Sequence, residues 1–200
     1  MTKHLKYFVF RTPDDVVIIN ATTPEEILKI DFFDYSKKTI ICVGGILSWN
    51  TSTIVDYYKM MATIYLNSKN YNYIILFHDY YCSVQPLAPT CPHLIGKVFG
   101  PGIDKLVSLG LPAENLEFAG QSAGAHIVAS VIENMVTPVK LLIGFDPGTG
   151  LTDFRRGLAQ FTIALRSDST NSGNINWNAD LELIVNGGIR YQPGCEELES

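Results

Sequence analysis

Short apolar runs alternate with longer segments of helical periodicity from Thr39 to Phe145. The runs have the length and continuity of strands that are buried on both faces. Strands and helices that alternate along a chain fold into a parallel sheet with right-handed crossovers. We therefore predict an α/β chain with a twisted, mostly parallel sheet flanked by helices. Strands are expected at Thr39–Val43, Tyr73–Phe77, Asn115–Ala119 and Lys140–Phe145, and helices at Thr53–Asn67, Leu94–Leu109 and Ala123–Met135.

Two local patterns refine this expectation. In Thr23-Pro24-Glu25-Glu26, a capping Thr, a Pro at the first helical position and a Glu three residues after the cap predict a helix start. Gly100-Pro101-Gly102 predicts a break in its helix, because Pro removes a backbone donor and clashes one turn back. Further strands are expected at Tyr7–Phe10, Val16–Asn20, Phe161–Leu165 and Leu181–Val185.

The length and composition suit a single domain over residues 1–200, since 46% of the 200 residues are hydrophobic and 18% are charged. The net charge of −5 and the lack of a Lys/Arg stripe argue against nucleic acid as a partner. No apolar run approaches the roughly 20 residues of a transmembrane helix, and no cysteine and histidine cluster suggests a metal. The apolar patch Tyr7–Phe10 is too short for a signal peptide. The chain is therefore expected to be either intracellular or recorded without its leader, which leaves the compartment open.

The segment Gly120-Gln121-Ser122-Ala123-Gly124 matches the pattern G-x-S-x-G and falls between a predicted strand and a predicted helix. In this context a strained turn lifts the serine hydroxyl above the sheet, and larger side chains at the two glycines would clash. The amino end of the following helix favours a developing oxyanion. We predict that Ser122 is a nucleophile; a chance glycine match is the competing interpretation.

Asp146 directly follows the predicted strand after the nucleophile. Functional groups of α/β sheets gather at the carboxyl ends of strands, and the chain order of Ser before Asp is that of a hydrolase triad. Asp146 is therefore predicted as the triad acid, although an Asp-Pro turn would explain it structurally. Asp153 and Asp168 are weaker candidates, because neither directly ends such a strand.

The glycine pair Gly44-Gly45 follows the first parallel strand. A glycine-rich turn at this place lets a backbone amide approach a substrate carbonyl. The amides of Ile46 and Ala123 are the predicted oxyanion hole. A tight turn without a ligand is the alternative.

Taken in order, these motifs resemble the pancreatic lipase family, which includes insect lipase-like proteins and venom phospholipases of the A type. The resemblance rests on Gly44–Leu47, Gly120–His126, Gly144-Phe145-Asp146-Pro147 and the late segment Asn186-Gly187-Gly188 with Gln192-Pro193-Gly194-Cys195. It implies an α/β-hydrolase fold, a carboxylic-ester hydrolase without a cofactor, a lipid ester as substrate, contact with a lipid interface and, in most of the family, secretion.

This chain departs from the family pattern at several places. The family usually has His-Gly and an aromatic residue where Gly44-Gly45-Ile46 stands, a His at the position of Gln121, and an Ala at the position of Gly148. The family's catalytic His follows the acid. Here all histidines precede Asp146, so the resemblance implies that the segment carrying the lid and that His is missing from these 200 residues. The histidines are His4, His78, His93 and His126.

None of these histidines matches the family's base. His126 corresponds to the Gly-Ala-His of the helix after the nucleophile, where the residue is not the base, and it is expected to be a hydrogen-bonded helix residue. His78 lies near a strand end and is the one that could substitute. His4 and His93 are expected on the surface or in a loop.

The remaining motifs are cysteines and sequons. Cys82 and Cys91 bracket a short loop and could form a disulfide in an oxidising compartment. Cys195 resembles a family cysteine that pairs further along the chain, and Cys42 is expected in the core. Asn20-Ala21-Thr22 and Asn50-Thr51-Ser52 are glycosylation sequons, a pattern that is frequent by chance.

Two functions remain open at this level. The first is a lipase-like hydrolase of triacylglycerol or phospholipid esters, in which Ser122 forms an acyl-enzyme and Asp146 orients a His. The second is an inactive protein of the same fold that binds or carries lipid. The retained Ser122 and Asp146 favour the first, and the absent His favours the second.

Overall fold

The computed structural model describes residues 4–45, 51–78, 91–148, 154–168, 178–189 and 192–194. Its centre is one eight-stranded sheet with the strand order β2-β1-β4-β3-β5-β6-β7-β8. The strands are β1 (Lys6–Thr12), β2 (Asp15–Asn20), β3 (Lys38–Val43), β4 (Tyr71–Phe77), β5 (Leu116–Gln121), β6 (Leu141–Phe145), β7 (Phe161–Arg166) and β8 (Leu181–Ile184). The helices are η2 (Pro24–Lys29), α1 (Thr51–Asn67), α3 (Cys91–Ser108), η3 (Ala113–Asn115), α4 (Ala123–Glu133) and η4 (Val185–Gly188).

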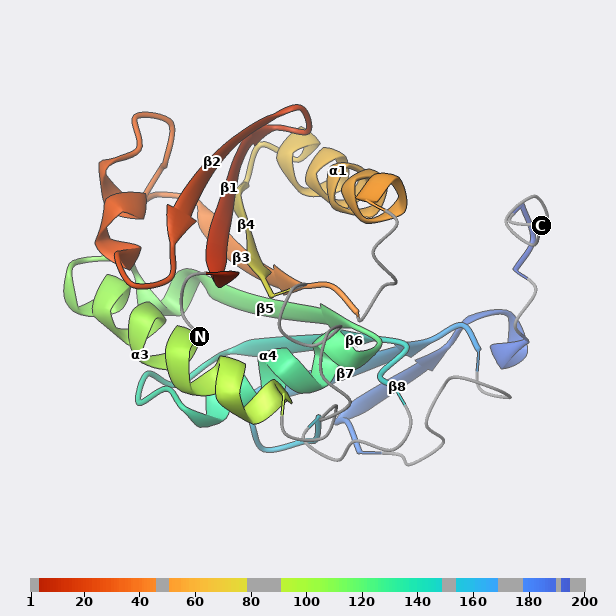
Figure 1. The fold of residues 1–200 in the computed structure, drawn as a ribbon. Coiled ribbons are helices and arrows are strands. Elements are labelled where there is room, and N and C mark those ends of the chain that lie inside the picture. The colour runs from red at the N-terminus through yellow and green to blue at the C-terminus, as the bar shows by residue number, and fades with distance from the viewer. Residues whose placement is uncertain are drawn as a thin grey trace.

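The sheet is twisted and mostly parallel, as predicted (Figure 1). β1 pairs with β2 and with β4 in antiparallel fashion, whereas the pairings from β4 through β3, β5, β6 and β7 to β8 are parallel. The carboxyl ends of β3, β5, β6 and β7 therefore lie at one edge of the sheet, which is the edge where functional groups of such folds gather.

Two apolar layers hold helices against the sheet. α3 and α4 cover one face over a large core that includes Phe99, Phe118 and Ile127, all fully buried. α1 covers β1, β3 and β4 on the opposite face over a smaller core around Tyr58 and Tyr73 (Figure 1). The central strand β5 is buried on both faces, and its one charged side chain, Glu117, accepts hydrogen bonds from Lys38 and Tyr71.

The predicted break at Pro101 is wrong, because α3 continues through it. Pro101 is exposed, so its ring displaces no core side chain. Gly96 and Gly100 allow α4 to approach closely: a Cβ at Gly96 would lie 2.5 Å from the Ser130 carbonyl oxygen. Burial of one large apolar side chain stabilises by about 1.5–3 kcal/mol, so several together outweigh the roughly 3 kcal/mol that a helical Pro costs. The fully buried residues of α3 include Ile95, Phe99, Ile103 and Leu106.

The helix start at Thr23 is confirmed in position but not in detail. Pro24 opens η2, a 3-10 helix of six residues, and Thr23 makes no side-chain capping bond. The Thr23 hydroxyl instead lies 3.5 Å from the carbonyl oxygen of Asn20, to which it donates. The Thr23 hydroxyl is therefore engaged in the tight turn that ends β2 and does not cap η2.

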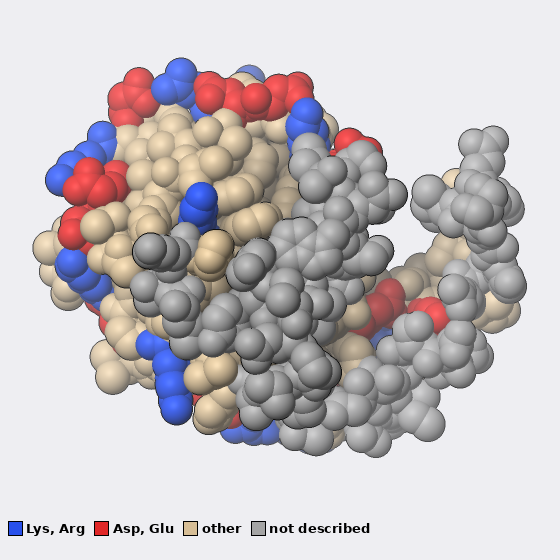
Figure 2. Space-filling view, in the orientation of Figure 1, with Lys and Arg blue, Asp and Glu red and all other residues tan. Residues whose placement is uncertain are grey.

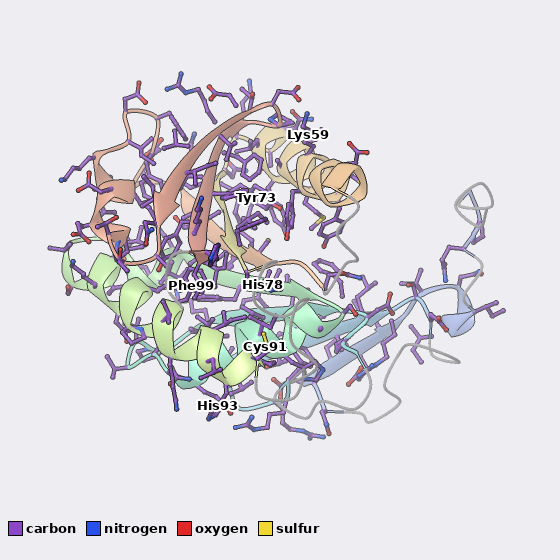
Figure 3. The ribbon with its side chains drawn as sticks, in the orientation of Figure 1. Lys59, Tyr73, His78, Cys91, His93 and Phe99 are labelled. Carbon is purple, nitrogen blue, oxygen red and sulfur yellow. The ribbon has the colours of Figure 1, made fainter. Side chains whose placement is uncertain are left out.

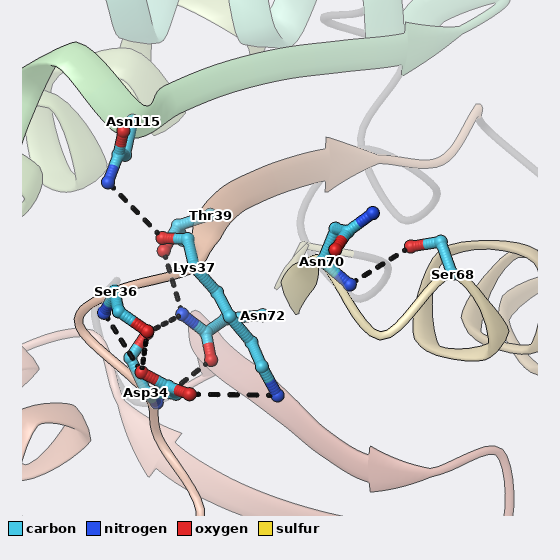
Figure 4. Close-up of polar contacts among 8 residues, drawn as sticks. All are labelled: Asp34, Ser36, Lys37, Thr39, Ser68, Asn70, Asn72 and Asn115. Atoms are coloured by element: carbon cyan, nitrogen blue, oxygen red, sulfur yellow. Dashed lines mark hydrogen bonds and ion pairs between the residues drawn. The ribbon is translucent and has the colours of Figure 1, made fainter.

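At the amino ends of the parallel strands, opposite the site, an asparagine at the start of β4 holds the chain that enters β3 (Figure 4). Asn72 accepts the backbone N–H of Asp34 at 3.1 Å and donates to the Asp34 carbonyl at 2.8 Å. Its amide also lies 3.2 Å from the hydroxyl of Thr39 in β3. Buried polar side chains need such partners, and this one fixes the chain where it enters β3.

One half of a sheet face has no helix over it among the described residues. Ile143 and Phe145 of β6 pack against the core under α1, so their register partners in β7 and β8 lie on the same face of the sheet. α1 itself lies over the β1–β4 side of that face (Figure 1). Phe161 is 44% exposed and Leu183 is 43% exposed. The side chains of this open face are Leu141, Ile143, Phe145, Phe161, Ile163, Leu165, Leu181 and Leu183.

Surface charge is mixed on the face shown in Figure 2, where acidic and basic side chains intermingle around the rim without a continuous basic stripe among the coloured residues. None of the helices in the described ranges is long and apolar enough to cross a bilayer.

Candidate active site

The carboxyl ends of neighbouring strands bring the predicted site residues together. Gly44 follows β3, Ser122 follows β5 and Asp146 follows β6. β5 lies between β3 and β6 in the sheet. The three motifs that are far apart in the sequence therefore meet at one edge.

Ser122 forms a strained turn between β5 and α4. Its backbone angles are φ 54° and ψ −123°, a region that a non-glycine residue rarely occupies. Its N–H donates to the Phe145 carbonyl at 2.8 Å, and its own carbonyl accepts the N–H groups of Ala125 and Gly148 at 3.2 Å each. These bonds to β6 and to the segment after it stabilise the strained conformation, and Ser122 remains partly exposed. Strain of this kind costs about 1–3 kcal/mol and is typical of functional positions.

The two glycines of the elbow are required by close backbone contacts. A Cβ at Gly120 would lie 2.5 Å from the Cα of Ala125. A Cβ at Gly124 would lie 2.5 Å from the Gly44 carbonyl oxygen and closer still to that of Val43. The obstructing atoms are backbone, which cannot rotate away. The glycines therefore let α4 begin directly against β3 and β5.

Asp146 ends β6 with a positive φ of 43°, and its N–H donates to the Leu165 carbonyl at 2.8 Å. Its carboxylate accepts three hydrogen bonds from the segment after β7. The N–H of Ser167 donates at 2.6 Å, the Ser167 hydroxyl donates to the other carboxylate oxygen, and the N–H of Asp168 donates at 3.3 Å. The carboxylate is thus held in a fixed orientation beside the elbow. Sequence reasoning missed Ser167, and nothing in its local sequence identifies it.

Asp168 is closer to the site than the sequence suggested. It lies two residues after the end of β7 and is 9% exposed. Its backbone touches Asp146, so two carboxyl-bearing residues stand at neighbouring strand ends. The sequence ranked Asp168 low because it does not directly end a strand, and the structure places it two residues after the end of β7. Asp153 lies outside the described residues.

The glycine turn after β3 is held from two sides. The side-chain oxygen of Gln121 accepts the N–H of Gly45 at 3.1 Å, and a Cβ at Gly45 would lie 3.0 Å from the Cβ of Ser122. Nε2 of His78, at the end of β4, lies 3.0 Å from the Gly44 carbonyl oxygen. The turn is therefore fixed against the elbow. Ile46, the first predicted oxyanion donor, lies outside the described residues.

The second predicted donor, Ala123, is the first residue of α4. N–H groups in the first turn of a helix have no intrahelical acceptor, so they remain available to an oxyanion. Gln121, directly before the nucleophile position, has a structural role here because its side-chain oxygen accepts the N–H of Gly45.

His78 is a neutral side chain held in one tautomer. Because a carbonyl only accepts, Nε2 of His78 carries the proton that it donates to Gly44. His78 is 1% exposed, and its Nδ1 has no hydrogen-bond partner among the residues that the structure describes. Burial lowers the pKa of His78 below its usual value. Its contact with the Gly44 carbonyl makes it a support of the turn.

This pKa direction predicts a pH effect on stability. Below about pH 6.5, the usual His pKa, this histidine binds a proton in the unfolded chain but stays neutral in the folded protein, where its pKa is lower. The free energy of unfolding should therefore fall with pH, by at most about 1.4 kcal/mol per pH unit, until the lowered pKa is reached. In His78→Gln this part of the slope should vanish, as measured by urea unfolding at pH 7.5 and 5.5. The exposed His93→Gln is the control, and an unchanged slope in His78→Gln would contradict the assignment.

The remaining histidines lie in structural or surface positions. Nε2 of His126 lies 3.0 Å from the Gly148 carbonyl oxygen, and Nδ1 accepts the N–H of Phe154 at 3.3 Å. Both ring nitrogens are thus engaged by backbone groups of the chain between β6 and β7, as expected of a structural helix residue. His4 is exposed, and His93 lies on the outward surface of α3, away from His78 (Figure 3).

The cysteines have different environments. Cys91, at the start of α3, is disulfide-bonded, and its partner lies outside the described residues. The pairing with Cys82 therefore stays a prediction. Cys42 is a free, buried core residue of β3, and burial raises the pKa of its thiol. Within the described ranges, no group of three His, Cys, Asp or Glu side chains could hold a metal ion.

Comparison with known proteins relates this architecture to an esterase. No family model matches the sequence, and no curated protein matches it. Among solved structures, esterase 2 of Thermogutta terrifontis phosphonylated by sarin superimposes with a TM-score of 0.56 at 12% identity, covering 90% of this chain and 78% of that one. Its butyrate-bound form gives 0.55 at 12% identity, with the same coverage.

The apo form of the same esterase gives a TM-score of 0.54 at 11% identity, covering 94% of this chain and 85% of that one. Likeness at this level of identity concerns the fold. Together with the mostly parallel eight-stranded sheet and the helices on both of its faces, it shows that this chain has the α/β-hydrolase fold.

Proposed function

We propose that this protein is a carboxylic-ester hydrolase in which Ser122 is the nucleophile. The observation that carries the proposal is the strained turn at Ser122, with φ 54° between β5 and α4, on a partly exposed serine. Backbone strain of this size is not expected at a serine whose role is only structural. The turn presents the hydroxyl at the edge of the sheet, directly before a helix amino end that favours an oxyanion.

The proposal assigns two further roles. Asp146 is the triad acid, supported by its place at the end of the next strand and by the three hydrogen bonds that orient its carboxylate. The amides of Ala123 and Ile46 form the oxyanion hole, supported by the fixed Gly44-Gly45 turn. In acyl transfer, the Ser122 oxygen bonds to the ester carbonyl carbon, the alcohol leaves, and water then releases the acid. The Ser122 hydroxyl proton passes to solvent or an added base, because His78 and His126 are bonded to backbone groups, and the departing alkoxide takes its proton from solvent.

We further propose a lipid ester as substrate, with contact to a lipid interface, and membership of the pancreatic lipase family for a single domain over residues 1–200. The ordered motifs around Gly44, Ser122 and Asp146 support this family. The esterase of similar fold has been observed with butyrate bound, which supports an ester or its acid as the ligand class.

The test is covalent labelling with a fluorophosphonate. The Ser122 oxygen forms a bond to phosphorus, the P–F bond breaks, fluoride leaves and the hydroxyl proton passes to solvent or an added base. We expect slow labelling at Ser122, found by peptide mass spectrometry, and none in Ser122→Ala. A positioned base contributes about 10²–10⁴-fold, so free imidazole should restore part of this and accelerate labelling about tenfold.

Three controls make the result decisive. Ser108→Ala, on an exposed turn end of α3, should label like the wild type, and heat-denatured protein should not label. Hydrolysis of p-nitrophenyl butyrate should be weak in the wild type and, like the labelling, should be lost in Ser122→Ala. Labelling that persists in Ser122→Ala would overturn the nucleophile. Rapid labelling that imidazole does not accelerate would instead show that the protein contains a base.

The second candidate is a lipid-binding protein of the same fold without turnover. It is favoured by the engagement of His78 with Gly44 and of His126 with Gly148 and Phe154. Equal affinity of wild type and Ser122→Ala for a fluorescent fatty-acyl ester, with no labelling of either, would support this candidate over the hydrolase.

A further inference from the structure

Asn20 lies on the outermost strand of the sheet, with β1 and β4 between that strand and β3 of the candidate active site. It is the last residue of β2, which is an edge strand of the sheet. Asn20 and Thr22 are exposed, whereas Ala21 between them is 4% exposed. The Ala21 N–H donates to the Leu5 carbonyl at 3.0 Å. The turn is therefore anchored through its middle residue, and its two polar side chains face outward.

The two polar side chains are joined through the amide oxygen of Asn20. The Thr22 hydroxyl donates to Oδ1 of Asn20 at 2.8 Å, and the Thr22 N–H donates to the same oxygen at 3.0 Å. Neither bond uses Nδ2, the nitrogen that a glycan joins. The folded chain thus presents the acceptor amide with its hydroxyl partner already in contact, and a glycan on Nδ2 would break neither hydrogen bond.

A second observation concerns the compartment. Cys91 is disulfide-bonded. Disulfides form and persist in oxidising compartments such as the secretory pathway and the cell exterior. Asparagine-linked glycans are added in the same pathway, to Asn-X-Ser/Thr sequons of secreted proteins.

A third observation is the exposed apolar edge beside Asn20. The interior of β2 reads Val16-Val17-Ile18-Ile19, and Ile18 is 51% exposed. An edge strand whose interior residues are β-branched and uncharged is a site for unwanted pairing with another chain, and proteins commonly protect such edges. A bulky hydrophilic group at the end of this short strand would protect it.

We infer that Asn20 is a site of N-linked glycosylation and that the glycan shields the β2 edge. The co-substrate is a lipid-diphosphate-linked oligosaccharide. The amide nitrogen of Asn20 forms a bond to C1 of the first sugar, the C1–O bond to the diphosphate breaks, the lipid diphosphate leaves with the electron pair, and the nitrogen loses one proton. This inference does not depend on the proposed hydrolase function.

The experiment is expression of residues 1–200 behind a secretory leader in eukaryotic cells, with Asn50→Gln present throughout so that only the first sequon is tested. The expected result is one glycan, seen as a mobility shift that an endoglycosidase removes and as a modified Asn20 peptide in mass spectrometry. Asn20→Gln and Thr22→Ala should each abolish the shift. Thr22→Ser keeps the hydroxyl and should retain it.

Secreted molecules that carry the Cys91 disulfide but an unmodified Asn20 would overturn the inference, because the disulfide shows that they passed through the oxidising compartment. For the shielding effect, folded protein is compared before and after enzymatic removal of the glycan. Light scattering should show greater self-association after removal, and Ile18→Lys should suppress that increase. Equal scattering before and after removal would overturn the shielding role.

Discussion

Replacing Arg166 by Met should lower the free energy of unfolding by about 3–5 kcal/mol, the usual cost of leaving one member of a buried ion pair without its partner. Arg166 in β7 and Glu182 in β8 form such a pair, with side chains only 4% and 7% exposed and Nε 2.7 Å from the carboxylate. The carboxylate also accepts the N–H of Ala179 at 3.0 Å. Met fills a similar space without a charge, so the buried carboxylate of Glu182 would remain without the positive charge of Arg166.

Urea unfolding measures this effect, and two variants control it. The double variant Arg166→Met/Glu182→Leu removes both charges and should recover much of the loss, because apolar replacement of a whole buried pair is often close to neutral. Lys59→Met breaks an exposed ion pair with Asp14 and should change the urea midpoint little. A single variant as stable as the double would contradict the importance of pairing.

Gly124→Ala should cost about 3 kcal/mol, the upper part of the range for overpacking. The new Cβ would meet the carbonyl oxygens of Val43 and Gly44, and these belong to the backbone of a central strand and its turn. Since the strand cannot move without disturbing the sheet, α4 would have to shift away from the elbow. Fluorophosphonate labelling of Ser122 should fall in the same variant.

Gly148→Ala is the matched control for Gly124→Ala. Its Cβ would lie 3.5 Å from the Ala123 nitrogen, an ordinary contact at the same elbow. Its unfolding free energy should change by less than about 1 kcal/mol, as expected without a steric conflict. If urea unfolding shows the same loss for both glycines, close backbone contact is not the cause at Gly124.

The sheet could be predicted from the sequence because its signal is local and repeated. β3 and β4 contain continuous apolar runs at residues 40–43 and 73–76, which are buried along their whole length. The nucleophile turn could be predicted for the same reason, since Gly120, Ser122 and Gly124 lie within five residues. The two glycines are needed because a Cβ at either position would collide with backbone atoms.

The partners of these motifs could not be predicted, because they come from distant parts of the chain. Ser167 reaches Asp146 across 21 positions, and Gln121 reaches Gly45 across 76. His78 could be identified only as a residue near a strand end, whereas its bond to Gly44 depends on the order of β3 and β4 in the sheet. Contacts of this kind follow from topology rather than from spacing.

The error at Pro101 has a similar origin. Local propensity predicts a break, because a helical Pro costs about 3 kcal/mol. The decisive interaction is instead the packing of Gly96 and Gly100 against Ser130 and Asn134 of α4. A helix–helix contact of this kind cannot be read from the sequence around Pro101. Tertiary packing therefore outweighs the local helix-breaking tendency of Pro101.

The open face of β6, β7 and β8 changes how spectroscopic data on this chain must be interpreted. The dye ANS fluoresces on exposed apolar surface, and its binding is often used to diagnose a molten globule. Here Phe161 and Leu183 already expose such surface in the folded chain. ANS fluorescence in dilute buffer is therefore an expected property of the native state, and loss of near-ultraviolet circular dichroism is the observable that would distinguish a molten globule from it.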